Sequence, residues 1–191
     1  TDGGSGKLNV TFGDYDLKKV TTSNNIVIND KIATRLSLAS TTRDGFSKNV
    51  VTGQDLDDAN SKGFRSDWMF DLNDTSSLRV FGQYFKVDRN GAAIRGIDDQ
   101  TPGMRNLSQD TVSQHELSSM VIAAIYESDL GFANLKAIAS IQEDDILVVR
   151  DNDRHNYLDP VLAIEGLPAG STYQRAEFTP ETSLVDTTTL E

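Results

Sequence analysis

Apolar and polar residues alternate along several segments of the chain, most clearly between Lys31 and Asp88. In residues 32–40, one set of alternate positions is mainly apolar and the other is small or polar. Residues 64–72 repeat this pattern with aromatic side chains in the apolar set, whereas residues 78–87 place apolar side chains in both sets. Because successive side chains of a strand point to opposite faces, the alternation predicts β-strands with one apolar and one polar face.

Short turns and long loops separate these segments. Turn-forming residues stand at 29–30 (Asn-Asp), 73–75 (Asn-Asp-Thr) and 128–131 (Ser-Asp-Leu-Gly). They suit the tight turns of hairpins, because they bond to their own backbone. The other connections are polar, and we predict loops at about 42–62, 89–112 and 142–185. Tight turns at one end of a sheet and long loops at the other are typical of outer-membrane barrels, although a water-soluble sandwich can show the same arrangement.

The same alternation predicts strands at residues 7–12, 17–28 and 132–141. The segment 113–126 fits two structures. Its apolar residues recur at helical spacing after Ser113-x-x-Glu116, a pattern typical of a helix N-terminus, yet they also alternate as in a strand. We predict a strand, because a tight turn and another alternating segment follow and would complete a hairpin. A short helical turn is expected at 158–164.

Composition excludes several classes of protein. The chain has 191 residues, a net charge of −11 and a pI near 4.5, which argues against nucleic acid as a partner. It contains no cysteine, so neither disulfides nor thiolate metal sites are expected. No apolar run is long enough for a membrane-spanning helix, but the strands of a membrane barrel alternate and would not produce one.

Both ends suggest a part of a longer protein. The sequence begins at Thr1 rather than Met, and we expect the Gly-rich residues 1–6 to be a linker. Residues 187–191 look like the start of a further strand.

Several motifs resemble the N-terminal part of the barrel in TonB-dependent outer-membrane receptors. They are GKLNVTFGDY at 6–15, INDKIATRLS at 28–37, RDGF at 43–46 with Asn49 and Thr52-Gly53, DD at 57–58 and KGFR at 62–65. The similarity is strong over residues 6–90 and weak beyond them.

The resemblance implies an all-β fold, namely an antiparallel, up-and-down transmembrane β-barrel segment. Residues 7–191 would form an open, curved sheet of about seven to eight strands. The family has barrels of about 22 strands that are filled by an N-terminal plug. Its members lie in the outer membrane of Gram-negative bacteria, in contact with lipid. They take up a scarce nutrient, such as siderophore-bound iron, cobalamin or an oligosaccharide.

The TonB energy-transducing complex would act through a plug segment that precedes Thr1, so these residues alone would not transport. Neither an enzymatic activity nor a cofactor is expected.

The interior of so wide a barrel is wet, so the polar faces of the strands are expected to line the lumen. The lumen-facing candidates are Asn9, Thr11, Arg35, Ser37, Arg65, Asp67, Asn134 and Lys136. Trp68, Phe70, Tyr126 and Phe132 lie beside the short turns, where an aromatic girdle would meet lipid headgroups. The short turns are therefore assigned to the periplasmic side and the long loops to the outside.

Loops on a rigid scaffold often carry binding residues. The loop candidates for ligand contact are Arg95, Arg105, Arg154, His155 and Tyr157. Arg89, Arg95 and Arg105 could meet an anionic ligand, but pairing with neighbouring Asp residues or solvation is the simpler interpretation.

Neither a metal site nor a catalytic site is predicted. Asp55-x-Asp57-Asp58 could hold a cation, but the spacing of an EF-hand is missing and a solvated acidic loop is the simpler interpretation. His115 and His155 are far apart in the sequence, and nucleophile, phosphate-loop and metalloprotease motifs are absent.

The alternative function, from a different class, is a soluble or secreted β-sandwich that binds a ligand such as a carbohydrate. A sandwich would join two apolar faces in one dry core, whereas a barrel would present its apolar face to lipid.

Overall fold

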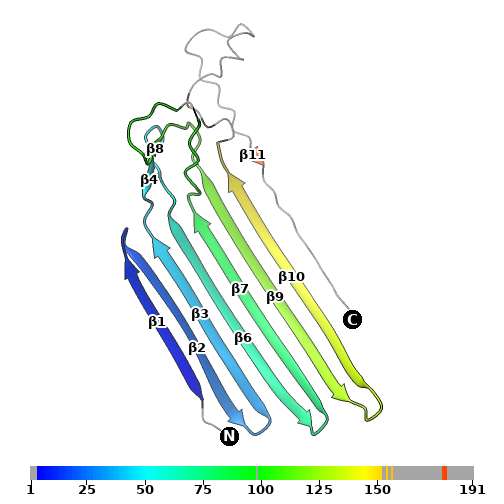
Figure 1. Cartoon of the computed structure of the whole chain (residues 1–191). Coiled ribbons are helices and arrows are strands. Elements are labelled where there is room, and N and C mark those ends of the chain that lie inside the picture. The colour runs from blue at the N-terminus through cyan, green and yellow to red at the C-terminus, as the bar shows by residue number, and fades with distance from the viewer. Residues whose placement is uncertain (1–3, 98, 152–153, 155, 157–177, 180–191) are drawn as a thin grey trace.

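The computed structural model describes residues 4–97, 99–151, 154, 156 and 178–179, and these residues form an all-β structure. An eight-stranded antiparallel sheet dominates it (Figure 1), with the order β1-β2-β3-β6-β7-β9-β10-β11. Its strands are β1 Ser5–Gly13, β2 Leu17–Asn29, β3 Ile32–Arg43, β6 Ala59–Asn73, β7 Ser76–Arg89, β9 Gln114–Asp129, β10 Asn134–Val149 and the short β11 Phe178–Thr179. A small three-stranded sheet at the loop end contains β4 Ser47–Asn49, β5 Asp55–Leu56 and β8 Asn106–Leu107.

Consecutive long strands are neighbours, so the sheet is an up-and-down meander that does not close into a barrel. The three predicted tight turns all lie at one end of it, the lower end in Figure 1. In each of them an Asn or Asp side chain accepts a hydrogen bond from the backbone N–H two residues on: Asn29 from Lys31 at 2.9 Å, Asn73 from Thr75 at 3.0 Å, and Asp129 from Gly131 at 2.7 Å. The predicted chemistry of these turns is therefore confirmed.

The ambiguous segment 113–126 is a strand, as predicted. It belongs to β9, which pairs with β7 along one edge and with β10 along the other. Two complete ladders satisfy its backbone, and this tertiary pairing overrides the local helical spacing.

The strands are longer than predicted. The loop expected at 42–62 spans only 44–58, because β3 continues to Arg43 and β6 begins at Ala59. The loop expected from residue 142 begins only after Val149, because β10 runs through Glu143-Asp144-Asp145. Acidic residues looked like a loop, yet they lie in a regular ladder opposite Ser118–Met120 of β9. Ser5 and Gly6 of the predicted linker pair with β2. The helical turn expected at 158–164 and the strand start at 187–191 lie outside the described residues.

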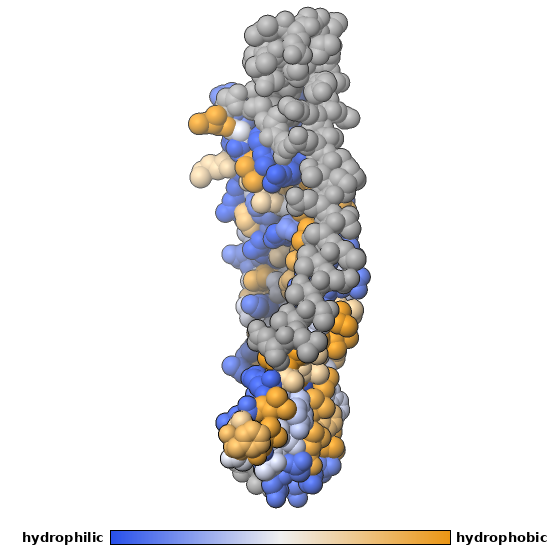
Figure 2. Space-filling model, turned by 90° about the vertical axis from the view of Figure 1, so that its right-hand side faces the viewer, coloured by the Kyte–Doolittle hydropathy of each residue, from blue (hydrophilic) through white to orange (hydrophobic). Residues whose placement is uncertain are grey.

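The pairing register sorts the side chains of the sheet onto two faces. One face, called here the apolar face, carries most of the exposed large hydrophobic residues of the strands. They include Leu8, Val10, Phe12, Val20, Ile26, Leu38, Phe64, Tyr84, Met120, Ile122, Leu135 and Ile141. The opposite face, called here the polar face, holds the charged and amide side chains described below. Figure 2, which views the sheet edge-on, shows hydrophobic residues along one side of its lower half and hydrophilic residues along the other.

Aromatic residues mark two rows across the apolar face. Ile32, Phe70, Leu78 and Tyr126 form a row near the turns, and Leu38, Phe64, Tyr84 and Met120 form a row toward the loops. The two rows are six residues apart on β6, which corresponds to about 20 Å along a strand. Immediately beyond the second row, the apolar face becomes polar on β3, β6, β7 and β9, with Ser40, Lys62, Lys86 and Ser118 in the next row. On β1 and β2 the same row still carries Val10 and Val20.

The sheet has almost no buried core of its own. Ala123 is the one buried hydrophobic residue of the main sheet among the described residues, and the other two, Leu56 and Leu107, lie in the small sheet. No helix in the described part of the chain is long and apolar enough to cross a membrane.

Candidate functional site

The predicted lumen residues share one face of the sheet. The register places Asn9, Thr11, Arg35, Ser37, Arg65, Asp67, Asn134 and Lys136 together on the polar face. Four of these residues are directly opposite one another on β3 and β6: Arg35 lies opposite Asp67, and Ser37 lies opposite Arg65.

An ion network centred on Asp67 occupies the middle of the polar face. Arg79 binds both carboxylate oxygens of Asp67, at 2.8 and 2.5 Å, and Arg65 approaches the same carboxylate at 3.2 Å. Both guanidinium groups lie over the ring of Phe81, with centroid distances of 4.3 Å for Arg65 and 5.7 Å for Arg79. Bidentate pairing and ring stacking hold these side chains in one geometry. Phe81 is thus an aromatic residue on the polar face, where it packs against two guanidinium groups. Its position accounts for one of the apolar residues that made the alternation of 78–87 irregular.

Cross-strand hydrogen bonds extend this network toward β1. Arg35 donates to Asn25 at 2.6 Å, and Ser37 donates to Ser23 at 3.0 Å. Farther toward the loops, Asn9 donates to Thr21 at 3.2 Å. On the same face but at the β9–β10 end of the sheet, near the turns, Lys136 pairs with Glu127 at 2.8 Å. The polar face is therefore suited to contact with water or with a polar partner.

The long loops at the other end of the sheet fold onto one another. We call this assembly the cap, and it consists of the loops 44–58 and 90–113 with their strands β4, β5 and β8. Strand β4 pairs with β5 of its own loop and, in parallel, with β8 of the other loop. Leu56 and Leu107 are almost fully buried within it, at 0% and 2% exposure. Gly45 allows this close packing, because a Cβ there would lie only 2.6 Å from the carbonyl oxygen of Leu56.

Buried amides connect the two loops. The side chain of Asn49 is fully buried, donates to the carbonyl of Gln109 at 2.9 Å, and accepts from the backbone N–H of Val51 at 3.1 Å. The side chain of Gln54 donates to the carbonyl of Ser113 at 2.6 Å and accepts from the N–H of Ser113 at 2.9 Å. These residues were not predicted as a unit. Asn49 was noted only as part of a motif, and its partner lies 60 residues away.

The acidic run of the first loop is only partly solvated: Asp55 is exposed, as predicted, whereas Asp57 and Asp58 are half-buried and hydrogen-bonded within the cap. Asp57 accepts from the hydroxyl of Ser47 at 2.5 Å and from the N–H of Ala93 at 3.0 Å. Asp58 accepts from the N–H of Asn90 at 2.8 Å. These carboxylates fasten the second loop to the first. Among the described residues, no group of three or more His, Asp or Glu side chains is placed to hold a metal ion.

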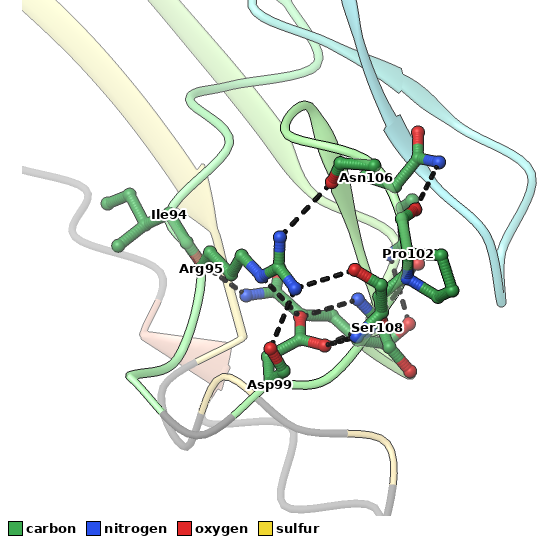
Figure 3. Close-up of polar contacts among 10 residues, drawn as sticks. Ile94, Arg95, Asp99, Pro102, Asn106 and Ser108 are labelled. Atoms are coloured by element: carbon green, nitrogen blue, oxygen red, sulfur yellow. Dashed lines mark hydrogen bonds and ion pairs between the residues drawn. The ribbon is translucent and has the colours of Figure 1, made fainter.

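Arg95, a predicted ligand contact, instead organises its own loop (Figure 3). Its guanidinium donates to the carbonyls of Asp99, Thr101 and Gly103, at 2.7, 2.6 and 3.1 Å. Its Nε lies 3.7 Å from the carboxylate of Asp99. The simpler interpretation, pairing with a neighbouring Asp, is the one that the structure supports for this residue.

The pKa of Asp99 lies below its ordinary value. Burial alone raises the pKa of this carboxyl, but three other effects together outweigh it: hydrogen bonds from the hydroxyl and N–H of Thr101, a hydrogen bond from the N–H of Ser108, and the charge of Arg95. All of these favour the ionised form.

This lowered pKa predicts that acid loosens the cap. The folded state binds the Asp99 proton more weakly than the unfolded state does. The resulting stability is therefore fully present above the unfolded pKa of about 4 and is lost as the pH falls through the lower folded value. Hydrogen exchange of residues 99–108, corrected for intrinsic rates, should speed up over that window. Asp99→Ala should exchange fast at neutral pH and lose most of this dependence, and an unchanged profile in the variant would contradict the assignment.

Arg105 lies in a cluster of arginine and aromatic residues where the cap meets the sheet. Its guanidinium donates to the hydroxyl of Tyr15 and lies over the ring of Phe46, 5.0 Å from the centroid. Arg43 lies over the same ring at 4.8 Å. Tyr15 has a φ of 58° in the turn between β1 and β2, a conformation that few non-glycine residues adopt. The cluster thus fixes the cap to this turn, and the Tyr15 and Phe46 partners were missed by the sequence analysis.

Of the remaining candidates for ligand contact, the structure describes Arg154 alone. The backbone N–H of Arg154 donates to Asp151 at 2.7 Å. His155 and Tyr157 lie outside the described residues. Arg89 contacts the Nδ1 of His115, with its Nη2 at 3.1 Å. Of the predicted ligand contacts, the structure therefore places Arg95 and Arg105 in the cap, both with partners in the chain.

Comparisons with protein-family models, with curated proteins and with solved structures found no match.

Proposed function

We propose that the chain is part of the barrel wall of a TonB-dependent outer-membrane receptor that takes up a scarce nutrient. The observation that supports this most directly is the apolar face, which carries many exposed hydrophobic residues, has two aromatic-containing rows across β3, β6, β7 and β9, and is backed by a polar face. Barrel strands in outer membranes have this alternation, with aromatic girdles at both edges of the apolar band.

The polar groups within the band support contact with lipid. The indole N–H of Trp68 donates to the hydroxyl of Ser66 at 2.8 Å, and the hydroxyl of Thr34 donates to the carbonyl of Asp67 at 3.0 Å. The amide of Asn24 donates to Thr22 at 3.2 Å. In hydrocarbon an unpaired polar group costs several kcal/mol, so such internal pairing is what a lipid-facing surface requires.

The alternative, a β-sandwich, needs a second sheet against the apolar face. In the described part of the chain the face lacks such a cover, and Leu8 and Phe12 are 66% and 75% exposed. Among the described residues, β1 has a free outer edge and β10 pairs on its outer side with β11 only at Val148 and Val149, which fits a wall that continues into further strands.

The proposal assigns a side to each part of the sheet. The apolar face meets lipid, the polar face meets the interior, the short turns face the periplasm and the cap faces outward. The nutrient belongs to one of three classes: siderophore-bound iron, cobalamin or an oligosaccharide. The TonB complex acts through a plug elsewhere in the whole protein, and the role is uptake without catalysis.

Trp68 provides a test, because it is the chain's one tryptophan and lies on the apolar face. The full chain is refolded into phosphatidylcholine vesicles whose acyl chains carry bromine, a contact quencher. Trp68 emission should be blue-shifted and should fall by more than half relative to unbrominated vesicles.

The matched control moves the tryptophan to the polar face. Phe81 lies opposite Asp67, so the double variant Trp68→Phe, Phe81→Trp should escape most of the quenching. Equal quenching of the two proteins would remove the support for a lipid-facing side. Failure of the wild type to enter vesicles, with emission like that of a soluble protein, would favour the sandwich.

A further inference from the structure

Two lysines face each other at the loop-side edge of the apolar face. Lys62 of β6 and Lys86 of β7 are directly opposite in the register, one row beyond Phe64 and Tyr84. Like charges at directly opposite positions destabilise an antiparallel pair. Within the described residues neither lysine has a carboxylate within 4.0 Å, whereas Lys18, on the same face, pairs with Asp16 at 2.7 Å. The pair is therefore a concentration of positive charge without an anion from the described chain.

Hydrogen-bonding groups surround Lys62 on its own side. Ser40 lies directly opposite it on β3, and Asn60 is the next residue of β6 on the same face. The acidic residues of this face, Asp88, Glu116, Glu143 and Asp145, lie closer to the loops or farther along the sheet, on β7, β9 and β10. Glu116 and Asp145 share a groove with Lys86, so the more positive part of the surface is at Lys62.

An apolar groove begins at this point on the same face. It has a volume of about 400 Å³ and includes Lys62, Ser40 and Thr22 among its lining residues. Its apolar walls come from four side chains of neighbouring strands, which are Val20, Leu38, Phe64 and Tyr84. A cationic and hydroxyl-bearing end that leads into an apolar groove matches the chemistry of an amphiphile with an anionic head.

We propose that Lys62 and Lys86 bind the phosphate of an anionic lipid whose acyl chain lies in the groove between Val20, Leu38, Phe64 and Tyr84. Ser40 and Asn60 supply additional hydrogen bonds to the head. This site deepens the proposed function and rests on it, because the groove is on the face assigned to lipid. The bound phosphate also offsets the repulsion between the two lysines.

Native mass spectrometry of the full chain tests the site. The protein is released from nonionic detergent micelles that contain equal amounts of phosphatidylglycerol and phosphatidylcholine with the same acyl chains. Wild-type protein should retain phosphatidylglycerol preferentially. A lysine near a charged lipid surface contributes about fivefold in binding, so Lys62→Gln and Lys86→Gln should each reduce the preference about fivefold and the double variant should abolish it.

Lys18→Gln is the matched control, because it removes a charge from the same face at a position already paired with Asp16. It should keep the wild-type preference. An equal loss in Lys18→Gln would show a diffuse charge effect and overturn the site, as would a double variant that still prefers phosphatidylglycerol. Excess glycerol 3-phosphate should not displace the lipid, and full displacement would show that the groove contributes nothing.

The two proposals fail differently. The Trp68 quenching experiment uses phosphatidylcholine alone and does not depend on the lysines. If quenching succeeds and the lipid preference is absent, the membrane assignment stands and the anionic lipid site is wrong. If Trp68 is not quenched, the apolar face does not contact lipid in a bilayer. Any lipid retained in the mass spectrum then reflects binding from the detergent micelle alone, and both proposals are overturned.

Discussion

Ile122→Arg is expected to lower the free energy of unfolding from a bilayer by about 2–4 kcal/mol, the range for arginine at the midplane of a membrane barrel. Ile122 is 52% exposed on the apolar face, in a row with Gly82 and Ile141 between the two aromatic-containing rows. At this depth the guanidinium would be far from both headgroup regions and would have to leave water. In a sandwich the same face would pack against a second sheet in a dry core, so an arginine there would also destabilise. The discriminating result is therefore a loss of this size measured from the bilayer, which a soluble sandwich would not enter.

Val121→Arg is the control, because it introduces the same residue one position earlier on the opposite face. Val121 lies between Gln83 and Gln142 on the polar face. There the guanidinium can reach water or the two amides, and we expect less than about 1 kcal/mol of change. Urea unfolding of the full chain from phosphatidylcholine vesicles, followed by the heat-dependent gel shift of barrel proteins, gives both values. Equal effects at 121 and 122 would show that the two faces meet similar surroundings, and the lipid assignment would fail.

The meander was predictable because its signals are local. Alternation of residue types fixed which segments are strands, and Asn29, Asn73 and Asp129 each close their turn with a bond to a residue two positions on. The choice of a strand at 113–126 depended on the neighbouring turn and strand rather than on its own pattern. Strand ends were predicted less well. In β10 the acidic residues 143–145 interrupt the alternation, so Asp144 looked like part of a loop although apolar residues follow at 146–149.

The cap was not predictable in the same way. Its contacts join residues that are distant in the sequence, such as Asn49 with Gln109 and Asp57 with Ala93. A polar loop that packs on another polar loop has the composition of a solvated one, because its core is made largely of amides and carboxylates. The structure thus changes the role of Asp57 from a solvated residue to a fastening point, and that of Arg95 from a ligand candidate to the organiser of a turn.

The sequence predicted which residues lie on the polar face, but not which of them bind one another. Alternation alone placed Arg65 and Asp67 on one side of β6. It could not show that Arg79, on the next strand, binds Asp67 with two hydrogen bonds, because strand pairing determines that contact. Residues 78–87 looked irregular for the same reason, since Phe81 faces the guanidinium groups rather than the apolar side.

Asn49→Ala is expected to loosen the contact between the two loops of the cap while the long strands stay folded. The substitution leaves the carbonyl of Gln109 and the N–H groups of Val51 and Gln109 without their side-chain partner, in a place where Asn49 is 0% exposed. Each buried group left unpaired costs roughly 1–3 kcal/mol, so we expect a loss of about 3 kcal/mol in the local stability of the cap. Among the described residues of this assembly, Leu56 and Leu107 alone form a buried apolar centre, so packing cannot compensate for the loss.

Amide hydrogen exchange of the full chain measures that loss residue by residue. A decrease of about 3 kcal/mol corresponds to roughly a hundredfold faster exchange for the N–H groups of Lys48, Val50 and Gln109, if the cap opens as one unit. The strands β6, β7 and β9 should keep their wild-type rates, because their ladders do not involve Asn49. Val50→Ala is the matched control, since its side chain is adjacent but 51% exposed, and it should leave exchange unchanged. If only the first loop exchanges faster in Asn49→Ala, the two loops are independent and the amide between them does not join the cap.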